Sequence, residues 1–281
     1  MPLVTKVVLQ MGDDVIVGIT GGSGVLGKLI SSLLKKISYD VSCFSGDIRN
    51  YKEILDWLSG RSFDAIFHFA ALVPAAVVEK EPITSLEINV AGTLNLVKAM
   101  KESGNTPWFF YASTSHVYKS SSIPIAETFP IEPITLYGLT KKMGEDIVWT
   151  TCVETKAKSC IGRIFSFWHE TQSREFLYPA IIERFKREDL KNPFLVKGAN
   201  NVRDLSNAED IVNKILLLMH KKAEGIYNIG SGKGITIRDF VQQIAPEKLT
   251  IITDGDQSED YLVADTSKFA AETNLKDTHD K

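Results

Sequence analysis

A regular alternation of short apolar runs with helical periods restricts the fold of this chain more than any other feature of its sequence. The runs are nearly continuously apolar and rich in β-branched or aromatic residues, as buried strands are, and they comprise Val15–Thr20, Val41–Phe44, Ala65–Ala70, Trp108–Ala112 and Cys160–Phe165. Between them, apolar residues recur at the three- and four-residue spacing of amphipathic helices, as in Leu26, Leu29, Ile30, Leu33 and Leu34. Because such alternation requires parallel pairing and right-handed crossovers, the sequence predicts an α/β fold with a doubly wound parallel sheet.

The pattern loosens after about residue 166. Three helices and two short strands are predicted there, at Tyr178–Arg187, Phe194–Val196, Asp210–His220, Ile226–Ile229 and Ile237–Ile244. We expect residues 1–165 to form the main domain, with residues 203–222 packing back onto it. Residues 166–281 should form mainly a smaller C-terminal lobe. The last twenty or so residues are polar, and we expect part of them to be disordered.

Composition and charge argue against several classes of function. The 281 residues carry a net charge of −3 without a cluster of Lys and Arg, so nucleic acid is not an expected partner. No apolar run approaches the ~20 residues that cross a bilayer, and the first residues lack the apolar core of a signal peptide. We therefore expect no membrane partner and a cytoplasmic location. Cys43, Cys152 and Cys160 have no metal-ligand spacing and the histidines form no HxxxH pattern, so no metal is expected; Cys43 and Cys160 fall in predicted buried strands.

The first predicted strand runs directly into a glycine-rich segment, Gly21-Gly22-Ser23-Gly24-Val25-Leu26-Gly27, and a helical period follows. In this GxxGxxG spacing Gly21 would permit a tight turn, Gly24 would let the backbone approach a pyrophosphate, and Gly27 would let helix and strand pack closely. The phosphates would then lie at the helix N-terminus. An ordinary strand–turn–helix connection can carry such glycines, but the elements on both sides favour the dinucleotide site of a Rossmann-type sheet. The expected cofactor is NAD or NADP.

The end of the second predicted strand leaves the choice between NAD and NADP open. An NAD site usually places a carboxylate there to bind the ribose 2′-hydroxyl. Asp47 comes slightly late for that role, and Ser45 with Arg49 could equally receive a 2′-phosphate. Arg49 is otherwise explained as a solvated surface charge.

Tyr137 and Lys141 are the candidate centre of the chemistry. Residues four apart share one helix face, and of the eight tyrosines only Tyr137 has a lysine four residues later. A free tyrosine has a pKa near ~10, and a nearby lysine cation, helped by an oxidised nicotinamide ring, would lower that pKa. Tyr137 could then exchange a proton with a substrate hydroxyl while hydride moves to or from the cofactor. The spacing alone is weak support, because exposed helices often carry such a pair.

The end of the fourth predicted strand strengthens this assignment. The strand leads into Ser113-Thr114-Ser115-His116, which places hydroxyl groups at the carboxyl edge of the sheet, where ligands of such sheets bind. A hydrogen-bond donor to a substrate oxygen is wanted at this edge. A turn-forming Ser/Thr cluster is the alternative explanation.

Several motifs together resemble the extended short-chain dehydrogenase/reductase family of nucleotide-sugar epimerases, dehydratases and reductases. The matching segments are Thr20–Gly27 (TGGxGxxG), Asp47-Ile48, His68–Ala71 (HxAA), Asn89–Thr93 (NVxGT), Thr114 with Tyr137 and Lys141, Arg203–Asp210, Tyr227–Gly232 (YNIGSG) and Asp265–Lys268 (DTSK). The ordered series covers nearly the whole chain and is far more specific than any one of its members.

The resemblance implies a role for each matching residue. Tyr137 would be the acid–base residue, Thr114 would position the substrate oxygen, and Lys141 would also hold the nicotinamide ribose. The residues implied in cofactor binding are Gly21, Ser23, Gly24, Val25, Leu26, Gly27, Asp47, Ile48, Phe69, Ala70, Ala71, Asn89, Tyr137 and Lys141. Those implied in binding a nucleotide-linked sugar are Thr114, Ser115, His116, Tyr137 and Arg203. A homodimer through the helices of Asn89 and Tyr137 is also implied.

Two of these roles have structural alternatives. Arg203 would meet the nucleotide diphosphate, or would only pair with Asp204 or Asp210. Asn89 would help to orient Lys141, or would only bridge helices.

Departures from the family's pattern narrow the function. Family dehydratases carry an Asp-Glu pair directly after the catalytic Thr, whereas this chain has Ser115 and His116, so a 4,6-dehydratase is not expected. The stretch before His68 lacks one strand–helix unit, as in compact reductases of 4-keto nucleotide sugars. The family's NxYGP segment is replaced by Ser166-Phe167-Trp168-His169-Glu170, so its substrate contacts are not carried over. His116 or His169 would be a further acid–base group, a substrate ligand or a structural residue.

Three functions fit the sequence. The main prediction is a reductase, in which NAD(P)H delivers hydride to a keto group on a nucleotide sugar and Tyr137 donates the proton. The alternative is an epimerase that oxidises and re-reduces the same carbon with retained NAD. The third is a non-catalytic relative that kept the fold, although such a protein has no need to retain Thr114, Tyr137 and Lys141 together.

Overall fold

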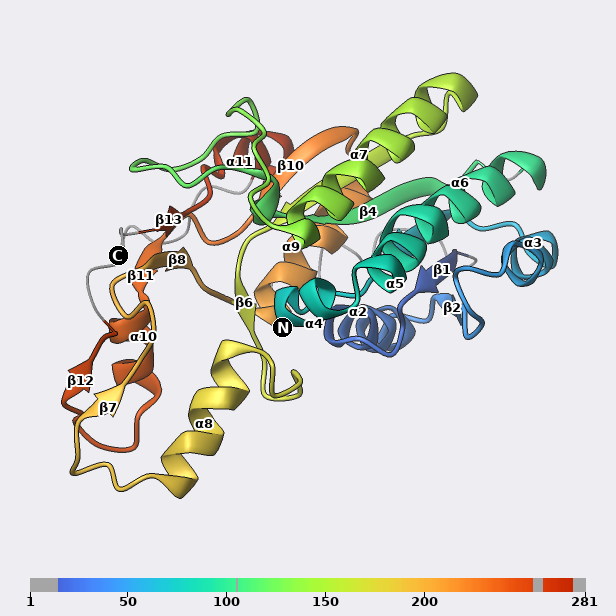
Figure 1. Ribbon diagram of the computed structural model, residues 1–281. Helices are drawn as coiled ribbons and strands as arrows, with labels where there is room; N and C mark the ends of the chain where they lie inside the picture. The colour runs from blue at the N-terminus through green and yellow to red at the C-terminus, as the bar shows by residue number, and fades with distance from the viewer. Residues whose placement is uncertain (1–14, 105, 255–259, 275–281) are drawn as a thin grey trace.

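The computed structural model describes residues 15–104, 106–254 and 260–274, and it is built around one six-stranded sheet (Figure 1). The strands lie in the order β10-β5-β4-β3-β1-β2, and their bounds are β1 Ile16–Thr20, β2 Asp40–Cys43, β3 Ala65–His68, β4 Trp108–Thr114, β5 Ser159–Ile164 and β10 Gly225–Ile229. Every pair of neighbouring strands is parallel. The predicted α/β fold with a doubly wound parallel sheet is confirmed.

Helices cover both faces of this sheet (Figure 1). One face carries α2 (Val25–Lys36), α9 (Ala208–Lys221) and α11 (Ser267–Thr273), and the other carries α3 (Tyr51–Ser59), α6 (Gly92–Glu102) and α7 (Leu136–Thr155). Leu26, Ile30 and Leu34 of α2 are buried in the core that α9 shares. Burial of such side chains stabilises the fold by about 1.5–3 kcal/mol each. This covering also explains why the central strands are apolar on both faces.

The main sheet takes elements from both halves of the chain. Strand β10 pairs with β5, and α9 packs against α2. Helix α9 lies within residues 203–222, which were expected to pack back onto the main domain, whereas β10 was assigned to the smaller lobe and belongs to the main sheet. Since a strand parallel to its neighbour requires a long crossover, α9 supplies the connection that brings β10 beside β5.

Strand β2 is more exposed than its apolar run indicated. It is the edge strand of the sheet, and Cys43 at its end is exposed, whereas Cys152 and Cys160 are buried. The expectation of a buried Cys43 was wrong because a short run of apolar residues cannot distinguish an edge strand from a central one.

The segment between β3 and β4 is divided into several helical elements. Helices α4 (Ala75–Lys80) and α5 (Pro82–Leu86) lead into a π-helical turn, η1 (Glu87–Ala91), which continues directly into α6. Asn89 is buried within this turn. π-Helical turns often occur at functional sites. After β4, a 3₁₀ turn, η2 (Ser115–Val117), follows Thr114.

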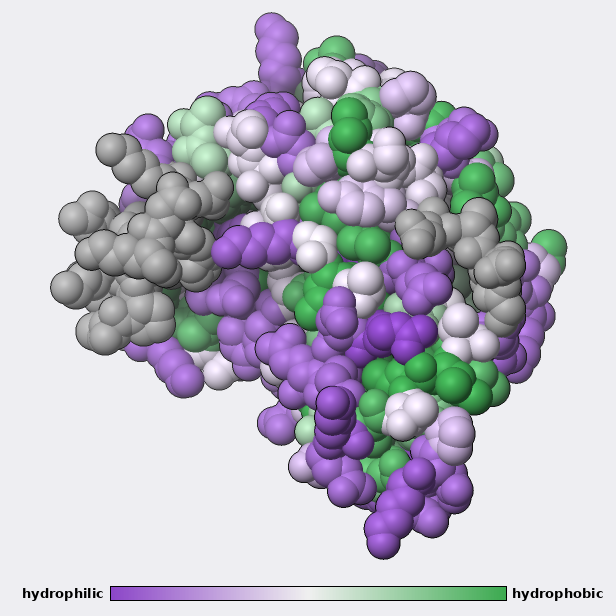
Figure 2. Space-filling model, turned by 90° about the vertical axis from the view of Figure 1, so that its left-hand side faces the viewer, coloured by the Kyte–Doolittle hydropathy of each residue, from purple (hydrophilic) through white to green (hydrophobic). Residues whose placement is uncertain are grey.

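The C-terminal lobe lies beside the main sheet (Figure 1) and is built from short strands with the helices α8 and α10. Its elements are β6 Phe167–Trp168, α8 Leu177–Arg187, β7 Phe194–Leu195, β8 Val202–Asp204, β9 Ser206–Asn207, β11 Gly234–Thr236, α10 Ile237–Ile244, β12 Ile251–Ile252 and β13 Tyr261–Leu262. Ile181, Phe194 and Val241 belong to an apolar core of its own. Seen from the side of this lobe, the surface is mostly hydrophilic, with smaller hydrophobic areas (Figure 2).

Three further findings concern the described part of the chain. It contains no helix that is both long and apolar enough to cross a membrane. Within the same residues, no group of three or more His, Cys, Asp or Glu side chains could hold a metal ion. Of the polar C-terminal segment that was expected to be partly disordered, β13 and α11 are regular elements, and residues 275–281 lie outside the described ranges.

Candidate active site

A cavity of about 770 Å³ lies where the glycine loop and the end of β4 face the C-terminal lobe. The sheet places β2 on one side of β1 and β3 on the other, and ligands of doubly wound sheets bind beside such a switch in strand order. The predicted site residues that line the cavity are Gly21, Ser23, Gly24, Val25, Leu26, Gly27, Phe69, Ala71, Thr114, Ser115, His116, Tyr137, Lys141 and Arg203. Four others do not line it, namely Asp47, Ile48, Ala70 and Asn89.

The glycine loop folds tightly against the segment after β3. Gly21 has a φ of +72°, and a Cβ built on it would lie 2.5 Å from the backbone nitrogen of Ala70. Only glycine meets both conditions without strain. At Gly24 the atom nearest to a built Cβ is the Gly21 carbonyl oxygen at 3.4 Å, so the loop leaves room on its cavity side. Helix α2 begins at Val25, and its first amides and positive dipole end suit a phosphate group.

A buried histidine joins the ends of β1 and β3 to α6. His68 Nδ1 lies 2.6 Å from Thr20 Oγ1, and His68 Nε2 lies 3.0 Å from Thr93 Oγ1. Thr93 donates its own proton to the Asn89 carbonyl oxygen at 2.7 Å, so it accepts from Nε2–H, and Thr20 donates to Nδ1. Burial, helped by the charge of Lys141, lowers the pKa of His68 to about 3. His68 is therefore a neutral structural link.

Asn89 supports the cavity from behind. Its side chain accepts from the Leu72 amide at 2.7 Å and donates to the Leu72 carbonyl oxygen at 3.0 Å. It also donates to Thr140 Oγ1 at 3.1 Å, one residue before Lys141 on α7. Leu72 lines the cavity, so Asn89 fixes both a cavity wall and the helix that carries Tyr137.

Tyr137, Thr114 and His116 come together in the cavity. The Thr114 hydroxyl hydrogen-bonds the Tyr137 phenol. Thr114 Oγ1 also accepts from the His116 amide at 3.2 Å, which leaves its proton for the phenol or for a ligand oxygen. The His116 ring lies edge-on to the Tyr137 ring, with centroids 5.9 Å apart. Burial, assisted by the charge of Arg203, lowers the pKa of His116 and keeps this imidazole neutral at pH 7.

Lys141 is almost fully buried, and its Nζ lies 4.3 Å from the centre of the Tyr111 ring. Burial lowers the pKa of Lys141 to about 7, although the carboxylate of Glu145 opposes this effect. Burial also raises the pKa of Tyr137 to about 12, against the effect of the Thr114 hydrogen bond. Lys141, helped by an oxidised nicotinamide ring, was expected to lower the pKa of Tyr137; in the chain without cofactor, desolvation acts on both groups and dominates for each. In this structure Tyr137 is a neutral phenol at pH 7.

Arg203 lines the cavity but is already engaged. Its guanidinium forms an ion pair with Asp260 and donates to the Asp260 carbonyl oxygen at 2.8 Å. The partners that the sequence suggested are not the ones observed. Asp204 instead accepts from Ser231 N at 2.8 Å and from Gly232 N at 2.8 Å, and so ties down the turn after β10.

An aromatic wall on the lobe side was not foreseen. Trp168, Tyr178 and Phe240 all line the cavity, with Trp168 4.9 Å from Tyr178 and 6.3 Å from Phe240 between ring centroids. Lys197 also lines this part. Because these residues come from β6, α8 and α10, no local spacing could group them. The only signal in the sequence was the replaced segment that contains Trp168.

The remaining sequence candidates lie outside the cavity lining. Both carboxylate oxygens of Asp47 lie 3.0 Å from Arg49 Nε on the surface, and this pairing lowers the pKa of Asp47 to about 2. Ile48 is buried and packs so closely against Gly92 that a Cβ at that glycine would lie 2.7 Å from its side chain. His169 Nε2 lies 3.3 Å from Glu209 Oε1 at the start of α9.

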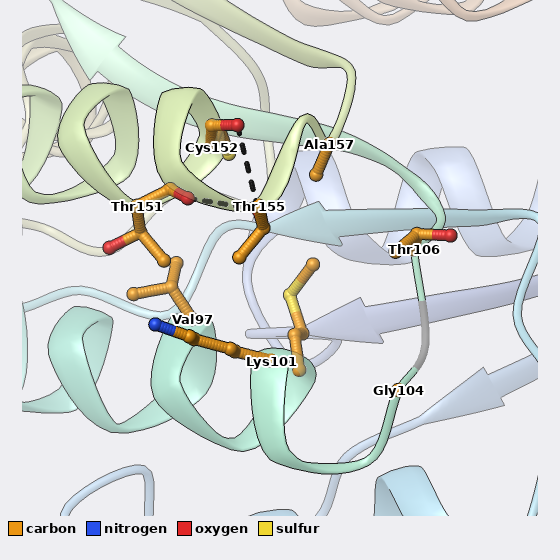
Figure 3. Close-up of a pocket in the computed structure, with 9 residues that line it drawn as sticks. Val97, Lys101, Gly104, Thr106, Thr151, Cys152, Thr155 and Ala157 are labelled. Carbon is orange, nitrogen blue, oxygen red and sulfur yellow. Dashed lines mark hydrogen bonds between the residues drawn. The ribbon is translucent and has the colours of Figure 1, made fainter.

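A second, smaller cavity of about 250 Å³ lies at the far ends of α6 and α7 (Figure 3). It is lined by Val97, Met100, Lys101, Gly104, Thr106, Thr151, Cys152, Thr155 and Ala157. Lys101 Nζ pairs with Glu154 at 2.6 Å, and burial raises the pKa of Cys152, so its thiol stays protonated. The chemistry predicted from the sequence therefore belongs to the larger cavity.

Comparison with known proteins identifies the family. A family profile described as GDP-mannose 4,6 dehydratase matches residues 4–279. The chain belongs to this family. The resemblance to nucleotide-sugar epimerases, dehydratases and reductases is thereby confirmed, and the chain is a member of an enzyme family.

Sequence relatives of the chain include both epimerases and a reductase. A putative UDP-glucose 4-epimerase of Methanocaldococcus jannaschii is 26% identical over 82% of this chain and 81% of its own length. A UDP-glucose 4-epimerase of Lactobacillus helveticus is 26% identical over 97% of this chain and 87% of its own length. A GDP-6-deoxy-D-mannose reductase of Pseudomonas aeruginosa is 28% identical over 68% of this chain and 66% of its own length.

Solved structures share the fold. RMD from Pseudomonas aeruginosa, complexed with NADPH, superposes with a TM-score of 0.85 at 23% identity, over 95% of this chain and 93% of that one. The UDP-glucose 4-epimerase of Thermus thermophilus, complexed with NAD, gives a TM-score of 0.79 at 22% identity, over 91% of this chain and 92% of that one. Both neighbours hold the class of cofactor, NAD or NADP, that the glycine loop predicted.

Proposed function

We propose that this protein is an NAD(P)-dependent reductase of a keto group on a nucleotide-linked sugar. The observation that carries the proposal is the meeting of Thr114, Tyr137 and Lys141 in the cavity that the glycine loop also lines. Bound NAD(P)H supplies a hydride to the carbonyl carbon. The protein then has to bind both molecules, exclude water and deliver one proton to the carbonyl oxygen.

Tyr137 suits the role of proton donor. With a pKa of about 12 the phenol is protonated at neutral pH, and Thr114 has a hydroxyl proton free to hydrogen-bond the same oxygen. In the reaction the carbonyl carbon gains the hydride, its oxygen takes the Tyr137 proton, and the phenolate is reprotonated from solvent. Lys141 would bind the ribose of the cofactor, and the glycine loop with the start of α2 would hold the pyrophosphate.

The lobe side of the cavity suits a nucleotide sugar. Lys197 offers positive charge for a diphosphate, and Arg203 would add to it by exchanging Asp260 for a phosphate. The aromatic wall offers apolar faces to a base or sugar ring. Ser115 and His116 stand where the family's dehydratases carry an acidic pair, and neither supplies a carboxylate. A buried neutral His116 offers instead a hydrogen-bond donor or acceptor to a substrate hydroxyl.

Reduction is tested by incubating the purified protein with NADH or NADPH and a panel of 4-keto nucleotide sugars. We expect the absorbance of the reduced nicotinamide to fall only when a substrate is present. A correctly folded protein that binds the cofactor but oxidises it with no member of the panel would contradict the proposal. The same assay shows whether NADH or NADPH is preferred.

An epimerase is the second candidate, because UDP-glucose 4-epimerases match up to 97% of the chain whereas the reductase matches 68%. An epimerase would retain NAD through purification and interconvert two sugars without net consumption of NAD(P)H. The same Thr114, Tyr137 and Lys141 serve both reactions, since an epimerase re-reduces the carbon that it has oxidised.

We also propose that the protein forms a homodimer through α6 and α7. Leu94, Leu139, Met143, Trp149 and Val153 are large apolar side chains on these helices that are exposed in the single chain. Apolar residues that gather on one surface usually mark an interface. We place the dimer in the cytoplasm, because three free cysteines suit a reducing compartment.

Replacing Trp149 and Val153 together by Glu should convert the dimer to a monomer, because each protomer would bury two unpaired charges in the interface. Light scattering coupled to size exclusion measures the change in mass. The matched control is Ile252→Glu, an exposed apolar residue of the lobe, which should leave the mass unchanged. A wild-type protein that is monomeric at all concentrations would refute the dimer.

A further inference from the structure

A buried ion pair lies one helical turn beyond Lys141. Glu145 follows Lys141 by four residues on α7, so the two side chains share a helix face. The Glu145 carboxylate accepts from Arg163 of β5 at both oxygens, with Nε 2.9 Å from Oε1 and Nη2 2.8 Å from Oε2. It also accepts from the Ser113 hydroxyl at 2.5 Å. The side chains of Glu145 and Arg163 are each only 3% exposed.

The ion pair is held rigidly from its far side. Arg163 Nη1 donates to the Tyr118 hydroxyl at 2.8 Å, and that hydroxyl donates to Asn228 Oδ1 at 2.9 Å. All of these side chains are buried. A buried ion pair adds little net stability, because the desolvation of both charges offsets their attraction. Stability therefore does not explain why the Glu145 charge is held in a fixed position. An effect of this charge on Lys141, one helical turn away, does explain it.

Among the described residues, the other titratable groups that face Lys141 are neutral at pH 7, and Glu145 is the one that supplies negative charge. Tyr111 on β4 places its ring beneath the ammonium, and burial holds the pKa of its hydroxyl well above 10. His68 on β3 and Tyr137 on α7 are also neutral at pH 7. Burial lowers the pKa of Lys141 to about 7 even though Glu145 opposes this effect, so without that carboxylate the ammonium would be lost at a lower pH.

We propose that Glu145 is a positioning residue that keeps the Lys141 side chain charged, and that the ion pair with Arg163 holds its carboxylate in the place from which it acts. The inference rests on the proposed function, because the charge matters where Lys141 meets the cofactor ribose and the Tyr137 phenol. A charged donor forms hydrogen bonds roughly twice as strong as a neutral one. Glu145 itself does not line the cavity.

The test is the pH dependence of cofactor binding, which needs no knowledge of the sugar. The dissociation constants of NADH and NADPH are measured by fluorescence with the full-length protein across neutral and alkaline pH. Wild-type affinity should fall as pH rises through the titration of Lys141. The variant Lys141→Arg stays charged over this range and should abolish the fall.

Glu145→Gln should move the midpoint of this fall to lower pH by about one unit, because a neighbouring carboxylate shifts a titration by at least that much. The double variant Glu145→Gln with Arg163→Met removes both buried charges, folds more readily than a broken pair, and should also lower the midpoint. Ser113→Ala is the matched control. It removes one hydrogen bond from the same carboxylate, keeps both charges, and should leave the midpoint in place.

Each outcome decides a separate question. If the double variant folds with the wild-type midpoint, or if Ser113→Ala shifts the midpoint as far as Glu145→Gln does, the inference is wrong. The proposed function would survive that result as long as the wild type binds cofactor and reduces a keto sugar. A folded wild type that binds neither NADH nor NADPH at any pH would refute both. If Glu145→Gln does not fold, the double variant decides.

Discussion

Replacing Tyr137 by Phe should lower turnover by about 10²–10⁴-fold, the usual contribution of a positioned acid–base group. The change removes the hydroxyl that Thr114 binds and leaves the ring that packs edge-on to His116. Cofactor affinity should therefore change little, and the melting temperature should stay close to that of the wild type. Turnover is measured with whichever keto sugar the substrate panel identifies, and affinity by nicotinamide fluorescence.

The matched control is Tyr51→Phe, which removes a surface hydroxyl that is bonded to Glu102 and lies outside the cavity lining. It should retain full turnover. A Tyr137→Phe protein as active as this control would remove Tyr137 from the mechanism. If the wild type binds cofactor but no substrate is ever turned over, the non-catalytic alternative gains support.

The sheet could be derived from sequence because its signal is local. Each apolar run marks one strand, and the helical periods between runs fix the parallel direction. The end of a strand is harder to predict from sequence where polar residues continue the strand beyond its apolar run. Strand β4 extends to Thr114, two residues beyond the apolar run, because Ser113 and Thr114 still pair with Arg163 and Ile164 of β5.

The glycine loop and the Tyr137–Lys141 pair were also predictable, since each depends on spacing within one element. The ion-pair partner of Arg203 could not be predicted. Asp260 lies 57 residues away in sequence and comes close to Arg203 only because β13 pairs with β8. The aromatic wall is likewise assembled from separate elements. The spacing of Lys141 and Glu145 was visible in the sequence, but its meaning depends on the burial of both groups.

Burial also explains why the electrostatics of the site were misjudged. From sequence, Lys141 is a cation that stabilises a phenolate at Tyr137. In the folded chain both side chains are desolvated, which favours the neutral form of each. Neutral Tyr137 is the form that donates a proton to a carbonyl oxygen, as the proposed reduction requires.

Substitutions in the glycine loop should separate folding from cofactor binding. Gly24→Ala should weaken NAD(P)H binding by about tenfold or more, which is about 1.4 kcal/mol, because the methyl group would occupy the space that the pyrophosphate needs. The backbone at Gly24 has φ −74° and ψ 168°, which alanine adopts freely, and no atom lies closer than 3.4 Å to the new Cβ. The free energy of unfolding should therefore fall by no more than about 1 kcal/mol.

Gly21→Ala should lower both the stability of the fold and the affinity for NAD(P)H. Its φ of +72° costs a non-glycine residue about 1–3 kcal/mol, and the new Cβ would also press against the Ala70 amide at 2.5 Å. Gly104→Ala is the control for strain alone, because Gly104 has a φ of +68° with no atom within 4 Å of a built Cβ. It should cost stability without affecting the cofactor. Urea unfolding and nicotinamide fluorescence measure the two effects, and a Gly24→Ala protein with wild-type affinity would show that the pyrophosphate does not approach the backbone there.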